Sequence, residues 1–256
     1  MVIRDWSSDV CSSDLESRVK TFDMTMFAGL APKLEENVLY PENRQWKYPK
    51  AGEDNSIVNV FIYDLQSQKT VKADIGTETD IYIPRVRWTK DAGQLGIIRL
   101  NRLQNKFELL FADAATGKTK VVYTDVNKYY IGENVLDDLT FLPGNQFIIS
   151  SERDGFNHLY LYNPDGSLLK QITSGNWDVT SYLGYDEKNK LFFYQSAEEH
   201  PTKKAVYSID LKGKKKVKLS TQAGTNTASF SNGFKFYINN FSNADTPPYI
   251  SLHDAN

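Results

Sequence analysis

Histidine, cysteine and exposed serine are the side chains most often used for metal binding and nucleophilic chemistry, and here they form no known pattern. His158, His200 and His253 lie 42 and 53 residues apart, without the His-x-His or i,i+4 spacing of a metal site. We interpret them as polar strand or turn residues, and we expect the His158 ring to support a neighbouring strand. The Gly-x-Ser-x-Gly turn that exposes the serine of an α/β-hydrolase is absent. The sequence therefore predicts no catalytic residue, no metal site and no cofactor.

Paired carboxylates are the second group of residues that could do chemistry. Glu35-Glu36 and Glu198-Glu199 each offer two acids that could bind a protonated amine. Both pairs lie in segments with loop character, where solvated charge is the ordinary role. A glycosidase would need paired acids spread over several structural repeats, and Asp80 and Asp137-Asp138 cannot be assigned such roles from the sequence. The acids by themselves identify no active site.

Charge and hydropathy exclude two classes of partner. The chain has 30 Lys plus Arg against 32 Asp plus Glu, a net charge near −2, so no attraction to nucleic acid is expected. The basic run 212–218 reads as the solvated face of a hairpin, and the run 114–119 lacks the first glycine and the following helix of a phosphate loop. No stretch of about 18 apolar residues occurs, so no membrane-spanning segment is predicted.

The first fifteen residues differ in character from the rest. The run from Asp5 to Leu15 has no apolar period and matches the translation of a widely used DNA-sequencing adapter. A Ser/Asp-rich disordered tail is the alternative interpretation. We therefore exclude residues 1–15 from fold reasoning as a non-native, disordered tail, and we expect the natural start of the gene to be missing. Cys11 belongs to this tail, so the remainder has no disulfide and its redox compartment cannot be predicted.

Internal repeats indicate the architecture. Strands that end in Asp or Asn recur at intervals of 49, 50, 47 and 44 residues, at Asp64, Asp113, Asn163, Asp210 and Asp254. Each complete copy continues through a Gly-containing turn into a second strand. An aromatic residue closes an earlier strand at the same period, at Trp88, Phe141, Tyr185 and Phe230. Each repeat thus has four strands in about 45 residues, the length and content of one propeller blade.

The sequence therefore predicts an all-β fold, a partial β-propeller of about four to five four-stranded blades. After a partial blade that ends near Gly76, blades are expected at 82–125, 139–180 and 183–220, and a last one from 228. The only helix expected is a short turn near Ala28 to Glu36. The last blade reaches Asn256 after its third strand, and the unpaired edge leads us to expect that the natural domain continues.

Several segments resemble one family. The segments Lys47-Tyr-Pro-Lys-Ala-Gly-Glu-Asp-Asn-Ser-Ile-Val58 and Arg99-Leu-Asn-Arg-Leu-Gln-Asn105 are similar to its Tyr-Pro-Lys-Ala-Gly-x-x-Asn and Leu-Asn-Arg-x-Gln-Asn segments. Ser151-Glu-Arg-Asp-Gly-Phe-Asn-His-Leu-Tyr-Leu-Tyr162 and Gln171-Ile-Thr-Ser-Gly-Asn-Trp-Asp-Val179 are similar to a second pair, and Glu16-Ser-Arg-Val19 to the end of a Phe-Asp-Glu-Ser segment. Residues 16–256 thus resemble the N-terminal β-propeller of dipeptidyl peptidase IV-like serine peptidases of the prolyl oligopeptidase family, most closely bacterial members of the Bacteroides type.

The resemblance implies an eight-bladed propeller over an α/β-hydrolase domain that this chain lacks. In the family, the two domains release Xaa-Pro or Xaa-Ala dipeptides from the N-termini of peptides by Ser-His-Asp acyl transfer. The propeller admits the substrate, and an aromatic-Glu-Glu segment, which neither Glu pair here matches, holds the α-ammonium group. The implied partners are peptide substrates, the protein's own hydrolase domain and a second copy in a homodimer. The parent protein is expected to be periplasmic, secreted or membrane-anchored.

One substrate-side element is expected to lie within the chain. Tyr130, Gly132, Glu133, Asn134 and Val135 fall where family members line the entrance to the extended substrate pockets. Their types do not match the best-known members, and an ordinary inter-strand loop is the alternative interpretation.

Two other functions are left open by the sequence. A stand-alone propeller that binds a peptide or protein partner is the main alternative, and a propeller glycosidase is a more distant one. The peptidase hypothesis predicts a reading frame that continues into a hydrolase with a Gly-x-Ser-x-Gly turn, whereas the binding module predicts a stop soon after the last blade.

Overall fold

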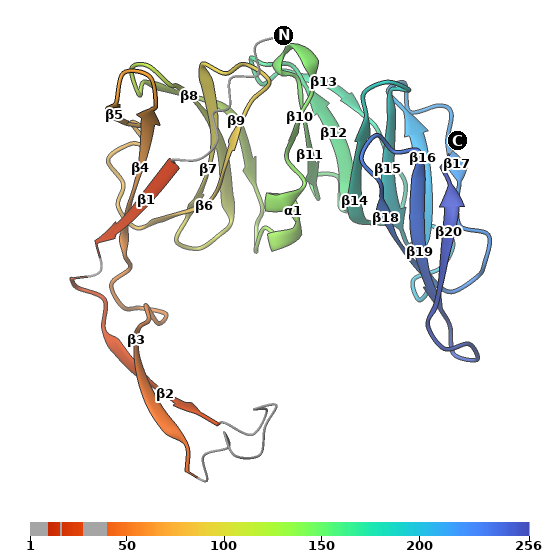
Figure 1. Ribbon diagram of the computed structural model, residues 1–256, viewed down its shortest axis with the longest axis horizontal. Helices are drawn as coiled ribbons and strands as arrows, with labels where there is room; N and C mark the ends of the chain where they lie inside the picture. The colour runs from red at the N-terminus through yellow and green to blue at the C-terminus, as the bar shows by residue number, and fades with distance from the viewer. Residues whose placement is uncertain (1–9, 16, 28–39, 256) are drawn as a thin grey trace.

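A series of antiparallel sheets stands side by side along an open arc (Figure 1). The computed structural model describes residues 10–15, 17–27 and 40–255. Three sheets have four strands each, in the order of the chain. They are β6 (Ile81–Trp88), β7 (Gln94–Asn101), β8 (Lys106–Asp113) and β9 (Thr119–Val126); β10 (Thr140–Phe141), β11 (Phe147–Ser151), β12 (His158–Tyr162) and β13 (Leu168–Gln171); and β14 (Val179–Asp186), β15 (Leu191–Ser196), β16 (Ala205–Asp210) and β17 (Val217–Lys218).

Incomplete blades lie at both ends of the arc. The first consists of β1 (Val10–Leu15), β4 (Ile57–Asp64) and β5 (Lys69–Lys72), and the last of β18 (Thr225–Phe230), β19 (Phe236–Ser242) and β20 (Tyr249–Asp254). The predicted all-β partial propeller is therefore confirmed. The predicted starts near 82, 139, 183 and 228 compare with observed first strands that begin at Ile81, Thr140, Val179 and Thr225.

The expected disorder of residues 1–15 is wrong for Val10–Leu15. These residues form β1, which pairs with β4 from Val10 opposite Ile62 to Leu15 opposite Ile57. Ladder hydrogen bonds use backbone groups that nearly every residue carries, so a segment of unrelated side chains can occupy this edge when the chain holds it there. Residues 1–9 of the tail, the helical turn expected near Ala28 to Glu36, and the pair Glu35-Glu36 lie outside the described residues.

Three further elements were not predicted. Strands β2 (Thr21–Met26) and β3 (Glu42–Lys47) form a two-stranded hairpin that projects from the first blade (Figure 1). A five-residue helix, α1 (Glu133–Asp137), precedes β10, and a short 3-10 turn, η2 (Pro143–Asn145), links β10 to β11. None of the helices in the described part of the chain is long and apolar enough to span a membrane.

The repeated aromatic residue of each blade closes the first strand, as predicted, and contacts the blade before it. Phe193 of β15 is 1% exposed and lies 4.4 Å from the ring of Phe230 and 5.1 Å from that of Phe234, both from the last blade. At the equivalent register two blades earlier in the arc, Gly96 leaves room for Phe141, whose ring would lie 2.7 Å from a Cβ at that position. The aromatic residues therefore recur once per blade because each packs against the preceding blade.

The hairpin turns of each blade also touch the preceding blade. Gly117 and Gly166 have φ angles of 71° and 87°, and a Cβ on them would lie 2.2 Å from the carbonyl oxygen of Lys72 and 1.5 Å from that of Val122. Both the positive φ and the close backbone approach require glycine at these positions. The glycines used to predict turns are therefore also inter-blade contacts.

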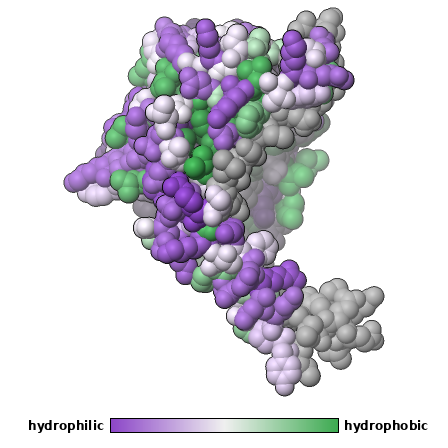
Figure 2. All heavy atoms as spheres, turned by 90° about the vertical axis from the view of Figure 1, so that its left-hand side faces the viewer, coloured by the Kyte–Doolittle hydropathy of each residue, from purple (hydrophilic) through white to green (hydrophobic). Residues whose placement is uncertain are grey.

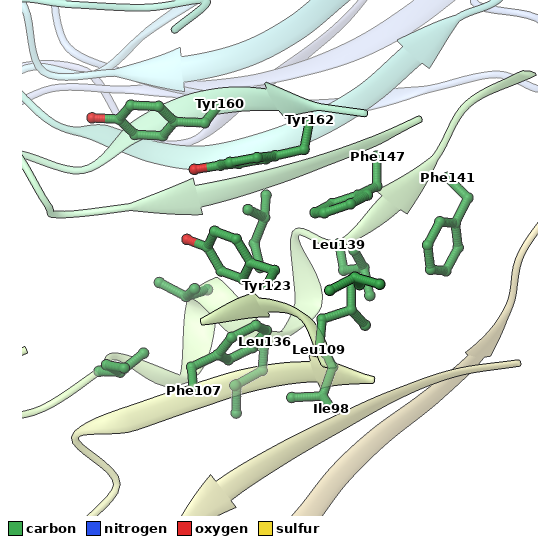
Figure 3. Close-up of a cluster of buried hydrophobic side chains, with 14 of the residues drawn as sticks. Ile98, Phe107, Leu109, Tyr123, Leu136, Leu139, Phe141, Phe147, Tyr160 and Tyr162 are labelled. Atoms are coloured by element: carbon green, nitrogen blue, oxygen red, sulfur yellow. The ribbon is translucent and has the colours of Figure 1, made fainter. Parts of the chain in front are cut away.

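Apolar side chains fill the space between adjacent blades. The cluster between the β6–β9 and β10–β13 blades contains Phe107, Leu109, Phe147 and Tyr162, all at most 2% exposed (Figure 3). Rings within it meet at edge and stacked geometries, such as Phe147 on Tyr162 at 5.2 Å. Residues Val135 and Leu136 of α1 belong to the same cluster, so the helix is built into the seam between two blades.

Each end of the arc leaves a blade face without this cover. In Figure 2, seen from the β1–β4–β5 end, hydrophilic residues cover most of the surface and apolar residues gather in a band in its middle. At the other end, Phe236, Ile238, Ile250 and Leu252 are 39 to 71% exposed and line or adjoin a hollow of about 400 Å³. Ile238 is at the register where Phe193 is buried one blade earlier.

We expect the chain on its own to self-associate through this end face, because burial of apolar area is favourable by about 25 cal/mol per Å². Replacing Ile238 and Leu252 by Lys should shift the chain towards monomer in sedimentation and lower its binding of hydrophobic dye. Asn240→Lys adds charge to the same face without removing apolar area and is the control. A wild-type chain that is monomeric and binds no dye would contradict this expectation.

Candidate functional site

The predicted substrate-side residues lie together between β9 and β10. Gly132 is the N-cap of α1, and Glu133 and Asn134 form its exposed first turn. Val135 is 4% exposed and points into the seam, whereas Tyr130 is 46% exposed. The predicted loop is therefore partly helical, with an outer polar side and an inner apolar side.

A hollow of about 190 Å³ lies on one side of this segment. Ile131, Gly132 and Val135 line it from the α1 side, and Asp125 and the 151–153 turn line it from the opposite side. Two of the predicted residues, Gly132 and Val135, thus border a hollow that also includes part of the Ser151-Glu-Arg segment.

The wall opposite α1 is held together by Arg153. Its Nη2 donates to the hydroxyl of Tyr123 at 2.7 Å, and the guanidinium lies 5.1 to 5.7 Å from the ring centres of Tyr123, Tyr160 and Tyr162. The hydroxyls of these three tyrosines point to the same side of the cluster (Figure 3). Burial and the nearby carboxylate of Asp125 raise the pKa of Tyr123, which keeps it neutral. The wall is thus one cation surrounded by aromatic rings, a rigid arrangement.

A second hollow, of about 400 Å³, lies on the other side of α1. Glu133 and Leu136 line it from the helix, and Tyr82, Arg85 and Leu100 line it from the preceding blade. Arg85 donates to both carboxylate oxygens of Asp137, at 2.7 and 3.2 Å. This bond holds the pKa of Asp137 below its ordinary value. The first turn of α1, Glu133 and Asn134, therefore lies between two hollows, and Glu133 lines the second of them.

The pKa of Asp138, directly after α1, is shifted in the opposite direction to that of Asp137. It is 8% exposed, and burial raises its pKa from 3.8 to about 6. Ser150 donates a hydrogen bond of 2.6 Å to its carboxylate, which opposes this shift, while neighbouring Asp137 adds to it and Arg87 opposes it. The end of α1 thus contains a carboxyl that titrates close to neutral pH.

The other residues considered from the sequence are not brought together. His158 is fully buried, and its ring bonds to Thr173 Oγ1 at 3.1 Å and the Gly175 carbonyl at 2.9 Å, which confirms its predicted supporting role. The two remaining histidines bond to nearby hydroxyls, His200 to Thr202 and His253 to Ser251. Within residues 10–15, 17–27 and 40–255 there is no group of three potential metal ligands.

The carboxylate pair Glu198-Glu199 serves as an ion-pair partner. Glu198 binds Lys216, which directly precedes β17, at 2.8 Å, and Glu199 binds Lys218 of β17 at 2.6 Å. The side chain of Glu198 is only 12% exposed, so the prediction of solvated loop charge is wrong for it. The lysines of the basic run neutralise these acids because the β17 hairpin lies beside their loop. Asp80 pairs with Arg102 at 3.6 Å.

Sequence reasoning missed the arginines around α1. Arg85 and Arg87 alternate on β6, and this was the available signal that both side chains share one face. Their partners in α1 are about fifty residues away, and no local pattern pairs them. Arg153 lies inside a recognised segment, but its role depends on Tyr123 from another blade.

Repeated four-stranded blades and turn glycines packed on preceding strands define the class of protein: a β-propeller domain, here with a polar segment set in a blade seam. The dipeptidyl peptidase IV (DPP IV) N-terminal region matches this sequence over residues 15–248. The chain belongs to that family.

Individual relatives agree with this assignment. The crystal structure of Porphyromonas gingivalis dipeptidyl peptidase 4 superposes with a TM-score of 0.85 and 41% identity, over 95% of this chain and 33% of that one. The structure of a putative dipeptidyl aminopeptidase IV from Bacteroides ovatus superposes with a TM-score of 0.77 and 25% identity, over 96% of this chain and 36% of that one. A probable dipeptidyl peptidase 4 of Emericella nidulans is 26% identical over 259 residues, or 94% of this chain and 32% of that protein. The chain therefore spans about a third of the length of these relatives.

We expect the stability of the α1 segment to depend on pH through Asp138. Its pKa of about 6 lies above the ordinary 3.8, so the folded segment favours the protonated form, and this stabilisation is lost as pH rises through 6. Hydrogen exchange of amides 133–138 should therefore show weaker protection at pH 7.5 than at pH 5, after correction for intrinsic rates. Asp138→Asn keeps an oxygen acceptor for Ser150 and should remove the difference. An equal pH dependence in both proteins would contradict the assignment.

Proposed function

We propose that this chain is the substrate-admitting part of the propeller of a serine exopeptidase that releases Xaa-Pro and Xaa-Ala dipeptides. Family membership supports a dipeptidyl peptidase as the parent protein. The observation that carries the proposal is the exposed first turn of α1, with Glu133 and Asn134 between two hollows at a blade seam. Side chains on a rigid seam can contact a passing peptide without moving.

The chemistry in this proposal is divided between domains. The chain has no Gly-x-Ser-x-Gly turn, so the serine, histidine and aspartate would come from the hydrolase domain. The propeller would contribute binding and selection, which act on KM more than on kcat when the contacts are equal in ground and transition states. We also propose a periplasmic, secreted or membrane-anchored location for the parent protein, where peptide substrates are available.

The test compares this chain with the complete protein, meaning the chain joined to the hydrolase domain that the proposal requires. The complete protein should hydrolyse Gly-Pro and Ala-Ala p-nitroanilides, and the chain alone should read at the buffer rate. Glu133→Gln should raise KM for peptides longer than three residues by about two- to fivefold, the usual size of one exposed polar contact, with kcat unchanged. Glu187→Gln, on an exposed turn of another blade, is the control.

Two results would reject this function. One is turnover by the chain alone that a serine-directed fluorophosphonate blocks. The other is a reading frame that stops soon after the last blade, which would favour a stand-alone module that binds a peptide or protein partner.

We further propose that the parent protein is a homodimer that uses the β2–β3 hairpin. Phe22, Met24 and Met26 alternate on β2, so they lie on one face, and Trp46 is opposite Phe22 in the register. These four side chains are 37 to 50% exposed, which leaves an apolar strip on a projecting element. Arg44 and Glu42 of β3 lie on the same face and form an ion pair of 3.4 Å with each other, so a polar pair adjoins the apolar strip.

Replacing Met24 by Lys and Trp46 by Ser should convert the dimer of the complete protein into monomer, because the apolar strip is lost. Light scattering after size exclusion measures the change in mass. Gln45→Lys, on the polar face of the same hairpin, should leave the dimer intact. A complete protein that is monomeric at micromolar concentration would contradict the proposal.

A further inference from the structure

Two arginines on one strand hold the end of α1 from the neighbouring blade. Arg85 and Arg87 are two residues apart on β6 and therefore lie on the same face. Arg85 makes a two-pronged bond to the carboxylate of Asp137, with Nε at 2.7 Å and Nη2 at 3.2 Å. Arg87 reaches two carbonyl oxygens, that of Asp137 at 3.1 Å and that of Leu139 at 3.0 Å.

These arginines bind groups at the end of α1 that a short helix cannot satisfy by itself. The last carbonyls of any helix have no intrahelical partner, and a helix of five residues has too few hydrogen bonds to persist by itself. Arg87 supplies donors to carbonyls at and just beyond this end, and Arg85 fixes the side chain of the last helical residue. The inner side of α1 is held by burial of Val135 and Leu136, so the arginines determine the orientation of its exposed side.

The exposure of the Arg85–Asp137 ion pair argues against a mainly stabilising role. The side chains of Arg85 and Asp137 are 47% and 55% exposed, and ion pairs as exposed as this contribute little to global stability. By contrast, the ion pair Arg99–Glu108 has side chains only 17% and 12% exposed, and it joins two strands of one blade instead of two blades. Bidentate geometry restricts orientation more than it adds binding energy in water.

We propose that Arg85 and Arg87 are positioning residues that set the placement of Glu133 and Asn134 relative to a bound peptide. This rests on the proposed function, since it assumes that the first turn of α1 contacts substrate. The blade that precedes α1 thereby controls affinity for the peptide, although neither arginine belongs to the catalytic machinery. We call the hydrogen bonds of Arg85 and Arg87 to Asp137 and Leu139 the clamp. Loss of the clamp leaves the helix in place through Val135 and Leu136 but widens the range of orientations of its outer side.

The test uses the complete protein with Arg85→Met, Arg87→Met and both changes together. Hydrogen exchange of amides 133–138 should accelerate by about tenfold in the double variant, and amides of β7 and β11 should not change. KM for a peptide longer than three residues should rise about three- to tenfold, with kcat within twofold. Arg87→Lys retains a donor and should recover part of the affinity.

A matched control is available in the same fold. Lys90–Glu187 is an ion pair between blades, with side chains 48% and 51% exposed, and its cation follows the same strand. Lys90→Met should change neither the exchange of α1 nor KM. Asp137→Asn should reproduce the effect of Arg85→Met, and combining the two should add nothing, because both remove one interaction.

The two measurements separate the possible failures. Faster exchange with unchanged KM would overturn the positioning role and leave a structural clamp. Unchanged exchange in the double variant would overturn the clamp itself, whatever the kinetics show. If the wild-type complete protein cleaves no dipeptide substrate, the proposed function fails, and the positioning role fails with it, while the exchange data still decide whether the clamp exists.

Discussion

Packing of each blade onto its predecessor is the interaction on which the remainder of this structure depends. The side chain that ends the first strand of a blade covers a residue on the second strand of the blade before, as Phe230 covers Phe193. Turn glycines bring the backbone of one blade against the outer strand of the previous one, as Gly166 does at Val122. Because a two-sided sheet is stable only when both faces are covered, the arc propagates blade by blade and leaves apolar faces at its ends.

The same seam packing explains where the α1 segment lies. Val135 and Leu136 fill the space between two blades, so α1 is anchored in the layer that joins them. Its polar turn is then directed outwards between two hollows. The walls of those hollows come from different blades, with Arg153 and its tyrosines on one side and Tyr82 with Arg85 on the other. A single blade could not form this site.

The segments that reveal the family are mainly structural. His158 binds the backbone and hydroxyl of the following segment, and Trp177 packs edge-on against its ring at 4.9 Å. Arg153 holds three tyrosines together. These residues are recognisable because each has buried, directional partners that few other side chains could satisfy. The exposed residues between Tyr130 and Val135 have fewer such partners within the protein, so this segment carries no comparable pattern.

The sequence by itself determined the all-β class, the repeat length and the first strand of each blade, because alternation, turn residues and recurring aromatics are local signals. It also placed Gly132, Glu133 and Asn134 in a segment between strands. Only the tertiary structure decided that this segment is helical, that Arg85 and Arg87 hold its end, and that Glu198 is ion-paired. It also decided that Val10–Leu15 pairs with β4, which a composition unlike a strand had argued against. The deciding partners of Arg85, Glu198 and Val10 lie on another blade or strand, 18 to 52 residues away. The local sequence carries no signal of a contact that only folding creates.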